Sequence, residues 1–146
     1  MAVDVTSSIE IDRPREAVSA FAADPSNVPA WYENIQSVEW LTEPRPELGS
    51  KIQFVAQFLG RRMEYAYEIT ELVPGERLVM RTAEGPFPME TTYTWEDTAG
   101  GGTRMHLRNR GEPAGFSKLA SFLMVPAMRR ANRKDLALLK SVLESR

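Results

Sequence analysis

A chain of 146 residues with 42% hydrophobic side chains is long enough to form one domain around its own core. Charged residues make up 26% of the chain with both signs mixed, which argues against disorder, and the net charge of −2 gives no general attraction to nucleic acid or anionic lipid. The absence of cysteine excludes disulfides, thiolate catalysis and cysteine-based metal sites.

No targeting segment is expected at the N-terminus. The opening residues, MAVDVTSSIEIDRP, lack the basic patch followed by an apolar core that marks a secretory signal. The longest apolar run, FLMVPAM at residues 122–128, is much shorter than the ~18 residues of a membrane span. We therefore expect a cytoplasmic protein without a membrane span, in which residues 1–146 form a single domain.

Two short helices are predicted after a first strand at residues 3–11. Asp12 is a suitable cap for the first helix, and Pro14 suits its first turn. The second helix starts at Asp24 and is bent or ended near Pro29.

Apolar residues recur at every second position from residue 34 onward, which predicts strands separated by proline and glycine turns. Short connections between these strands predict antiparallel hairpins in chain order. The predicted strands are residues 34–43, 51–59, 62–72 and 76–83, followed by two runs within residues 85–110.

Helical spacing returns after Gly111 and Pro113 and predicts a helix over residues 115–144. A helix of that length spans roughly 45 Å, and Pro126 is expected to kink or divide it.

This order of elements indicates an α+β fold, in which a curved antiparallel sheet of about seven strands wraps around a long C-terminal helix, with two short helices after the first strand. The terminal helix is the only predicted element long enough to cover the apolar face of such a sheet. Because a strongly curved sheet on a single helix leaves space between them, we expect a cavity lined by strand residues of one parity.

Aromatic and methionine side chains dominate the face that should line this cavity. Packing in a core would explain many of them, but inward tyrosines need partners for their hydroxyls, and methionines make adaptable linings. Trp31 is expected to gate one mouth, and Thr91, Tyr65, Tyr67 and Asn109 to orient an otherwise apolar ligand. The predicted ligand-binding residues are Trp31, Phe54, Phe58, Met63, Tyr65, Tyr67, Met80, Phe87, Met89, Thr91, Tyr93, Met105, Asn109, Phe116, Leu119 and Leu123.

His106 is the only histidine, and it alternates with the strand positions that should face the cavity. It shares its parity with Arg104, Arg108 and Arg110, a pattern typical of the solvated face of an antiparallel strand. A role as general base is the alternative, but we expect this side chain to point outward. A lone histidine without cysteine also argues against zinc, and we expect no cofactor.

Other polar features favour structural interpretations. Glu64, Glu68 and Glu90 alternate with apolar neighbours and should point outward, so no pair of carboxyl groups converges as a glycoside hydrolase would need. GGGT at 100–103 lacks the lysine of a phosphate loop and joins two strands. RRANRK at 129–134 indicates a solvated helix face or, alternatively, a cationic rim for a ligand carboxylate or phosphate.

Several motifs together resemble the SRPBCC superfamily, the START-like, helix-grip proteins, and most closely bacterial members of polyketide cyclase/dehydrase or lipid-transport type. The resemblance covers nearly the whole chain. It implies the helix-grip fold but no catalytic residue, since the superfamily shares no catalytic set. It is carried by Trp31, LGSKIQF, GRRMEYAYEITELVPGERL, GPFP, TYTWED, GGGTRMHL and RRANRKDLALLKSVLE.

Three functions remain open at this point. The preferred one is binding of a small hydrophobic or aromatic molecule, such as a lipid, polyketide or isoprenoid, and it predicts a cavity with few titratable groups. A cyclase or dehydratase acting on such a molecule predicts an inward acid or base with a perturbed pKa. A protein-interaction module predicts a filled cavity and an exposed apolar patch. Catalytic residues and oligomeric state are left open.

Overall fold

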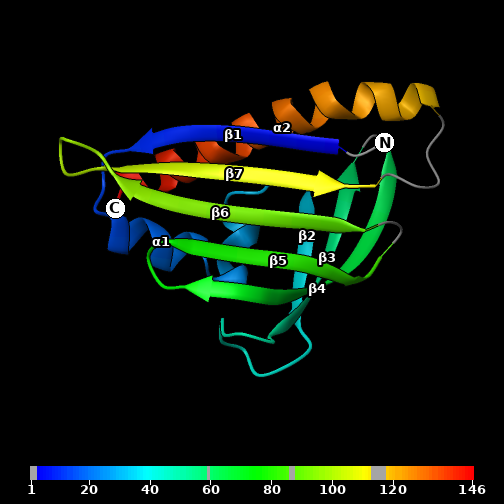
Figure 1. The fold of residues 1–146 in the computed structure, drawn as a ribbon, viewed down its shortest axis with the longest axis horizontal. Coiled ribbons are helices and arrows are strands. Elements are labelled where there is room, and N and C mark those ends of the chain that lie inside the picture. The colour runs from blue at the N-terminus through cyan, green and yellow to red at the C-terminus, as the bar shows by residue number, and fades with distance from the viewer. Residues whose placement is uncertain (1–2, 59, 86–87, 113–117) are drawn as a thin grey trace.

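A seven-stranded antiparallel sheet and one long helix dominate the structure, a computed structural model that describes residues 3–58, 60–85, 88–112 and 118–146 (Figure 1). The strand order is β1-β7-β6-β5-β4-β3-β2, so every strand except β1 pairs with its neighbour in sequence. The predicted α+β meander is therefore confirmed. The elements are β1 (Val3–Ile11), α1 (Arg15–Ala22), η1 (Pro25–Ala30, a 3₁₀ helix), β2 (Ile35–Trp40), β3 (Lys51–Phe58), β4 (Arg61–Val73), β5 (Arg77–Glu84), β6 (Met89–Asp97), β7 (Thr103–Gly111) and α2 (Lys118–Glu144).

The sheet bends strongly between its two edges. Figure 1 shows β2 and β3 running across the direction of β6 and β7. The register between β4 and β5 shifts between Ala66 and Tyr67 and again between Ile69 and Glu71. The extra residue is Ala83 of β5 at the first shift and Thr70 of β4 at the second, and such bulges increase the local twist and bend the strand that carries them. The bend gives the sheet a concave inner face that α2 covers.

Two groups of apolar side chains fill most of the space between the sheet and the helices. The larger group, with Trp31 and the second half of α2, includes the fully buried Leu136, Leu139 and Leu143. The smaller group, at the first half of α2, is rich in methionine. It comprises Val3, Val5, Met63, Tyr65, Met89, Met124 and Met128. None of the helices that the structure describes has the length and apolar character required to cross a bilayer.

The predicted cap of the first helix was wrong, and of the two effects predicted for Pro126, a kink or a division of the helix, the division does not occur. Asp12 does not cap α1, because Pro14 occupies the N-cap position and the backbone N–H of Asp12 donates to Glu144 Oε2 at 2.7 Å. Pro126 does not divide α2, which continues from Lys118 to Glu144. Pro126 lies on the exposed side of the helix, where water can solvate the carbonyl that loses its intrahelical partner. The predicted start of the second helix is confirmed, since Asp24 is the N-cap of η1 and its Oδ1 accepts from the Ser26 N–H.

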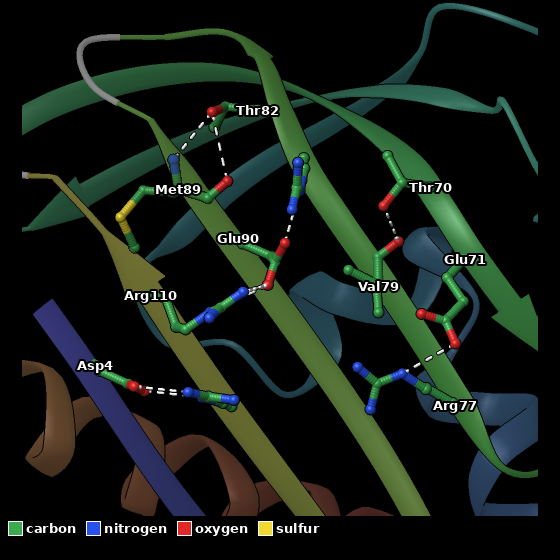
Figure 2. Close-up of polar contacts among 11 residues, drawn as sticks. Asp4, Thr70, Glu71, Arg77, Val79, Thr82, Met89, Glu90 and Arg110 are labelled. Atoms are coloured by element: carbon green, nitrogen blue, oxygen red, sulfur yellow. Dashed lines mark hydrogen bonds and ion pairs between the residues drawn. The ribbon is translucent and has the colours of Figure 1, made fainter. Parts of the chain in front are cut away.

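The outer face of the sheet carries cross-strand ion pairs instead of a second layer. Glu90 on β6 accepts hydrogen bonds from Arg110 on β7 and from Arg81 on β5, the latter at 2.6 Å (Figure 2). Arg108 makes two hydrogen bonds to Asp4 on β1, at 2.9 and 2.7 Å. The pKa of Glu90 lies below its ordinary value. Partial burial acts to raise this pKa, but the hydrogen bonds and charges of Arg110 and Arg81 lower it by more. These charges are paired along the sheet and do not reach the inner face.

Two adjacent leucines of α2 provide a test of how the helix packs. Leu139 is fully buried, whereas Leu138 is 42% exposed. Replacing Leu139 by alanine should lower the free energy of unfolding by about 2–5 kcal/mol, because it removes buried methyl groups and leaves a cavity. Leu138→Ala should change it by less than about 1 kcal/mol. Urea unfolding of both variants measures the difference, and equal losses would contradict the helix orientation.

Candidate functional site

A cavity of about 140 Å³ lies between the inner face of the sheet and α2. Strands β3 to β7 form one wall, and α2 forms the opposite wall. The segment between η1 and β3 closes one side. The lining residues are Val28, Tyr32, Asn34, Ile35, Phe54, Ala56, Met63, Tyr65, Tyr67, Met80, Met89, Thr91, Tyr93, Asn109, Met124, Met128, Ala131, Asn132 and Asp135.

Most of this lining is apolar and adaptable. Met63 and Met89 come from the sheet and Met124 and Met128 from α2, and all four are buried. The Tyr65 hydroxyl donates to Met63 Sδ at 3.3 Å, and burial raises the pKa of Tyr65 to about 12. Unbranched thioethers fill irregular space and adjust to different shapes, so this end of the cavity can accommodate an apolar group.

Two tyrosine hydroxyls form a polar point on the wall. Tyr32, just after η1, and Tyr93 on β6 lie with their hydroxyl oxygens 2.6 Å apart. Burial raises the pKa of both well above the ordinary value, so both hydroxyls keep their protons at neutral pH. One proton forms the bond between them. The other is therefore available to a third group.

A short chain of polar side chains forms a second such point. Thr91 Oγ1 donates to Asn109 Oδ1 at 2.7 Å, and Asn109 Nδ2 donates to Asn132 Oδ1 at 3.1 Å. Asn132 is 4% exposed, and its own Nδ2 has no hydrogen-bond partner among the residues that the structure describes. Since buried N–H groups are rarely left without an acceptor, this amide of the cavity lining is a donor that an oxygen atom within the cavity can satisfy.

Asp135 is the acidic group in the cavity lining. It sits on α2 one turn after Asn132, is 3% exposed, and accepts the backbone N–H of Glu33 at 3.0 Å through Oδ1. Burial raises the pKa of Asp135 to about 6, although the bond from Glu33 opposes this effect. The cavity therefore contains a carboxyl group that changes charge close to neutral pH, as an acid or base catalyst requires.

The structure brings many of the predicted residues to the cavity wall. Alternation along the strands identified their inward faces correctly, which explains this agreement. The predicted residues that line the cavity are Phe54, Met63, Tyr65, Tyr67, Met80, Met89, Thr91, Tyr93 and Asn109. Phe87 and Phe116 lie outside the described residues, as do the side chains of Phe58 and Leu119.

Three predicted residues lie elsewhere. Trp31 is fully buried and packs against Tyr32 and Tyr93, with ring centroids 4.4 and 5.7 Å away. It therefore supports the tyrosine pair and does not stand at a mouth of the cavity. Met105 faces inward but is packed in the larger apolar core, because parity determines the face of a strand and not the position along it. Leu123 is 53% exposed, since its neighbour Met124 takes the inward position on α2.

The outward assignments are confirmed. His106 lies on the outer face, where Nδ1 is 2.6 Å from Ser8 Oγ and Nε2 is 3.2 Å from Glu96 Oε1. Glu64 pairs with Arg62 on the same face. Among the described residues, no three histidine or acidic side chains come together as a metal site would require. Arg130, Arg133 and Lys134 are exposed and do not line the cavity, which agrees with the solvated helix face expected for residues 129–134.

Sequence patterns missed the polar residues of α2 and Tyr32. Asn132 lies within, and Asp135 directly after, the basic stretch 129–134, whose charges favour a solvated helix face. Helical spacing could have found them, because they precede the apolar Leu136 and Leu139 by four residues each and so share their face. Tyr32 follows Trp31, and nothing in the local pattern distinguishes which aromatic ring faces the cavity.

The chain belongs to the family described as polyketide cyclase/dehydrase and lipid transport, whose model matches residues 2–144. It is thus a member of the SRPBCC superfamily, and its sheet and terminal helix form the helix-grip fold that the sequence resemblance implied. No curated protein matches the sequence.

Solved structures share this fold at low sequence identity. A protein of Thermus thermophilus superposes with a TM-score of 0.83 at 23% identity, covering 97% of both chains. The Zhui aromatase/cyclase from a Streptomyces species gives 0.85 at 15% identity, covering 99% of this chain and 94% of that one. A START superfamily protein from Mycobacterium smegmatis gives 0.81 at 13% identity, covering 97% of both.

The raised pKa of Asp135 predicts how stability depends on pH. The folded protein binds this proton more tightly than the unfolded chain does, so the contribution of Asp135 to stability is largest below pH 3.8 and falls as the pH rises through about 6. Asp135→Asn removes this dependence while keeping an oxygen for the Glu33 N–H. Between pH 4 and pH 7.5 the variant should therefore gain about 2–3 kcal/mol relative to the wild type.

Urea unfolding at both pH values measures this difference. Glu16→Gln, which removes an exposed carboxyl group on α1, whose residues do not line the cavity, serves as the control and should keep the pH dependence of the wild type. A constant difference between the wild type and Asp135→Asn across the range would contradict the assigned pKa.

Proposed function

We propose that the protein binds a small, mainly apolar or aromatic molecule that carries an oxygen acceptor, in the cavity between the sheet and α2. The observation that carries this proposal is the buried Asn132 amide, whose Nδ2 lacks a partner among the described residues. The free tyrosine proton of the Tyr32–Tyr93 pair is a second donor on the same wall. A carbonyl, ether or phenol oxygen in an apolar frame complements both.

The size of the cavity indicates the size of the ligand. A volume of about 140 Å³ is similar to that of apolar cavities that hold a single benzene ring, which is roughly 150 Å³. A ligand with one ring and a short substituent therefore fits without rearrangement. Larger lipids, polyketides or isoprenoids would require the methionine side chains to move, which their flexibility permits. The open cavity also disfavours the interaction-module hypothesis, which predicted a filled interior.

Acetophenone and ethylbenzene test the proposed role of the amide. They share the ring and overall shape, but only acetophenone carries an oxygen acceptor. The protein should bind acetophenone about tenfold more tightly, because the carbonyl satisfies the buried N–H of Asn132. Asn132→Leu should remove this preference and leave the affinity for ethylbenzene within about threefold, as measured by calorimetric or NMR titration.

Gln53→Leu is the matched control, because it makes the same change from amide to leucine on β3, where Gln53 bonds to Glu64 away from the cavity. It should leave both affinities unchanged. Equal affinity for the two ligands in the wild type would contradict the role of Asn132. Failure of both to bind would contradict the proposed ligand class.

A second candidate function is catalysis of a cyclisation of the aldol type, favoured by the inward Asp135. Its carboxylate would take a proton from a carbon next to a carbonyl, and the donors on the wall would stabilise the resulting enolate oxygen. The enolate carbon would then attack a second carbonyl of the same molecule, forming a C–C bond. The new alkoxide would regain the proton from Asp135, which leaves the overall composition unchanged.

Deuterium exchange into the acetyl group of acetophenone isolates the first step. In D₂O the protein should accelerate exchange, with a rate that rises with pH through about 6 as Asp135 loses its proton. Asp135→Asn should lower the protein-dependent rate at least about 100-fold, and Glu16→Gln should not. Binding of acetophenone without accelerated exchange would retain the binding function and reject the catalytic one.

A further inference from the structure

The overall charge of −2 conceals an uneven distribution along α2. Between residues 121 and 141 Asp135 is the one acidic residue, and it is turned into the cavity. Arg130, Arg133 and Lys134 are exposed, and the structure describes no ion pair for them, unlike the arginines on the outer face of the sheet. The outward side of this helix is therefore a local cationic surface on a weakly acidic protein.

Two large apolar side chains are exposed on the same side of the helix. Phe122 is 78% exposed and Leu123 is 53% exposed, which makes Phe122 the most exposed large apolar side chain of the described residues. At about 100° per residue, Phe122, Leu123, Arg130 and Arg133 fall within one arc of the helix surface. Figure 1 shows the first half of α2, in orange, beyond β1 at the margin of the molecule.

We propose that the outward side of α2, formed by Phe122, Leu123, Arg130, Arg133 and Lys134, docks the protein on an anionic lipid surface. The order of these residues along the helix suits a bilayer. The arginines lie roughly 12–16 Å from Phe122 along the axis, so a tilted helix with its apolar end among the acyl chains places them at the level of the lipid phosphates.

A lipid surface explains the combination of exposed cations and exposed apolar side chains on α2 better than nucleic acid or the cavity ligand does. The α2 surface lacks the interleaved aromatic residues on which nucleic-acid bases stack, and the cavity ligand lies on the opposite side of the helix. Met124 and Met128 line the cavity from the inner side of the segment whose outer side would touch the lipid. This proposal concerns the outer surface alone and does not depend on what the cavity binds.

Vesicle flotation tests the proposal directly. At low salt the wild type should float with phosphatidylcholine vesicles that contain phosphatidylglycerol and not with pure phosphatidylcholine vesicles. Changing Arg130, Arg133 and Lys134 together to glutamine should weaken binding roughly 100-fold, since each cation near an anionic surface contributes about fivefold. High salt should weaken binding of the wild type, because it screens these contacts. Phe122→Ser with Leu123→Ser should weaken it at least about tenfold.

Matched controls distinguish binding through the outward side of α2 from effects of net charge and of exposed apolar side chains elsewhere. Changing Arg45, Lys51 and Arg62 to glutamine alters net charge by the same amount at exposed sites away from α2, and should leave flotation unchanged. Leu48→Ser with Leu41→Ser removes two other exposed leucines and should also have no effect. Absence of wild-type flotation with the anionic vesicles, equal flotation with both vesicle types, or equal losses in the control variants would each overturn the proposal.

Discussion

One long helix must cover the concave face of a seven-stranded sheet. Its apolar side chains are too few to fill all the space beneath that face, and the rest of the structure follows from this constraint. The second half of α2, with α1 and Trp31, fills one end completely. At the other end α2 presents methionines and polar side chains, and the two walls do not meet. The cavity is thus a consequence of curvature and of limited side-chain volume, since close-packed interiors otherwise leave few voids.

Polar groups on the cavity wall are arranged so that few of them are charged. The buried tyrosines keep their protons, and the Thr91–Asn109–Asn132 chain consists of neutral groups. Asp135 is the exception, and its raised pKa reflects the cost of holding a carboxylate in this environment. A site of this kind can recognise an oxygen atom without excluding an apolar frame, which suits both binding and acid–base chemistry.

Full charges are placed on the two outer surfaces instead. On the sheet they alternate and neutralise one another, as in the Arg81–Glu90–Arg110 group. On α2 they share one sign and lie next to exposed apolar side chains. The same helix therefore separates a neutral, ligand-sized cavity on one side from a cationic surface on the other, which net charge alone does not reveal.

Local patterns in the sequence determined the elements, their order and the inward faces of β3, β4, β6 and β7, because alternation and helical spacing depend on nearest neighbours alone. They also placed His106 and Glu64 outside correctly. Where the cavity lies along the strands was decided by tertiary structure, so Asn109 lines it whereas Met105, of the same parity, is packed in the core. Asn132 and Asp135 follow the helical face of Leu136 and Leu139, whereas packing against the sheet decided that Met124 and Met128 are buried and that Phe122 and Leu123 stay exposed.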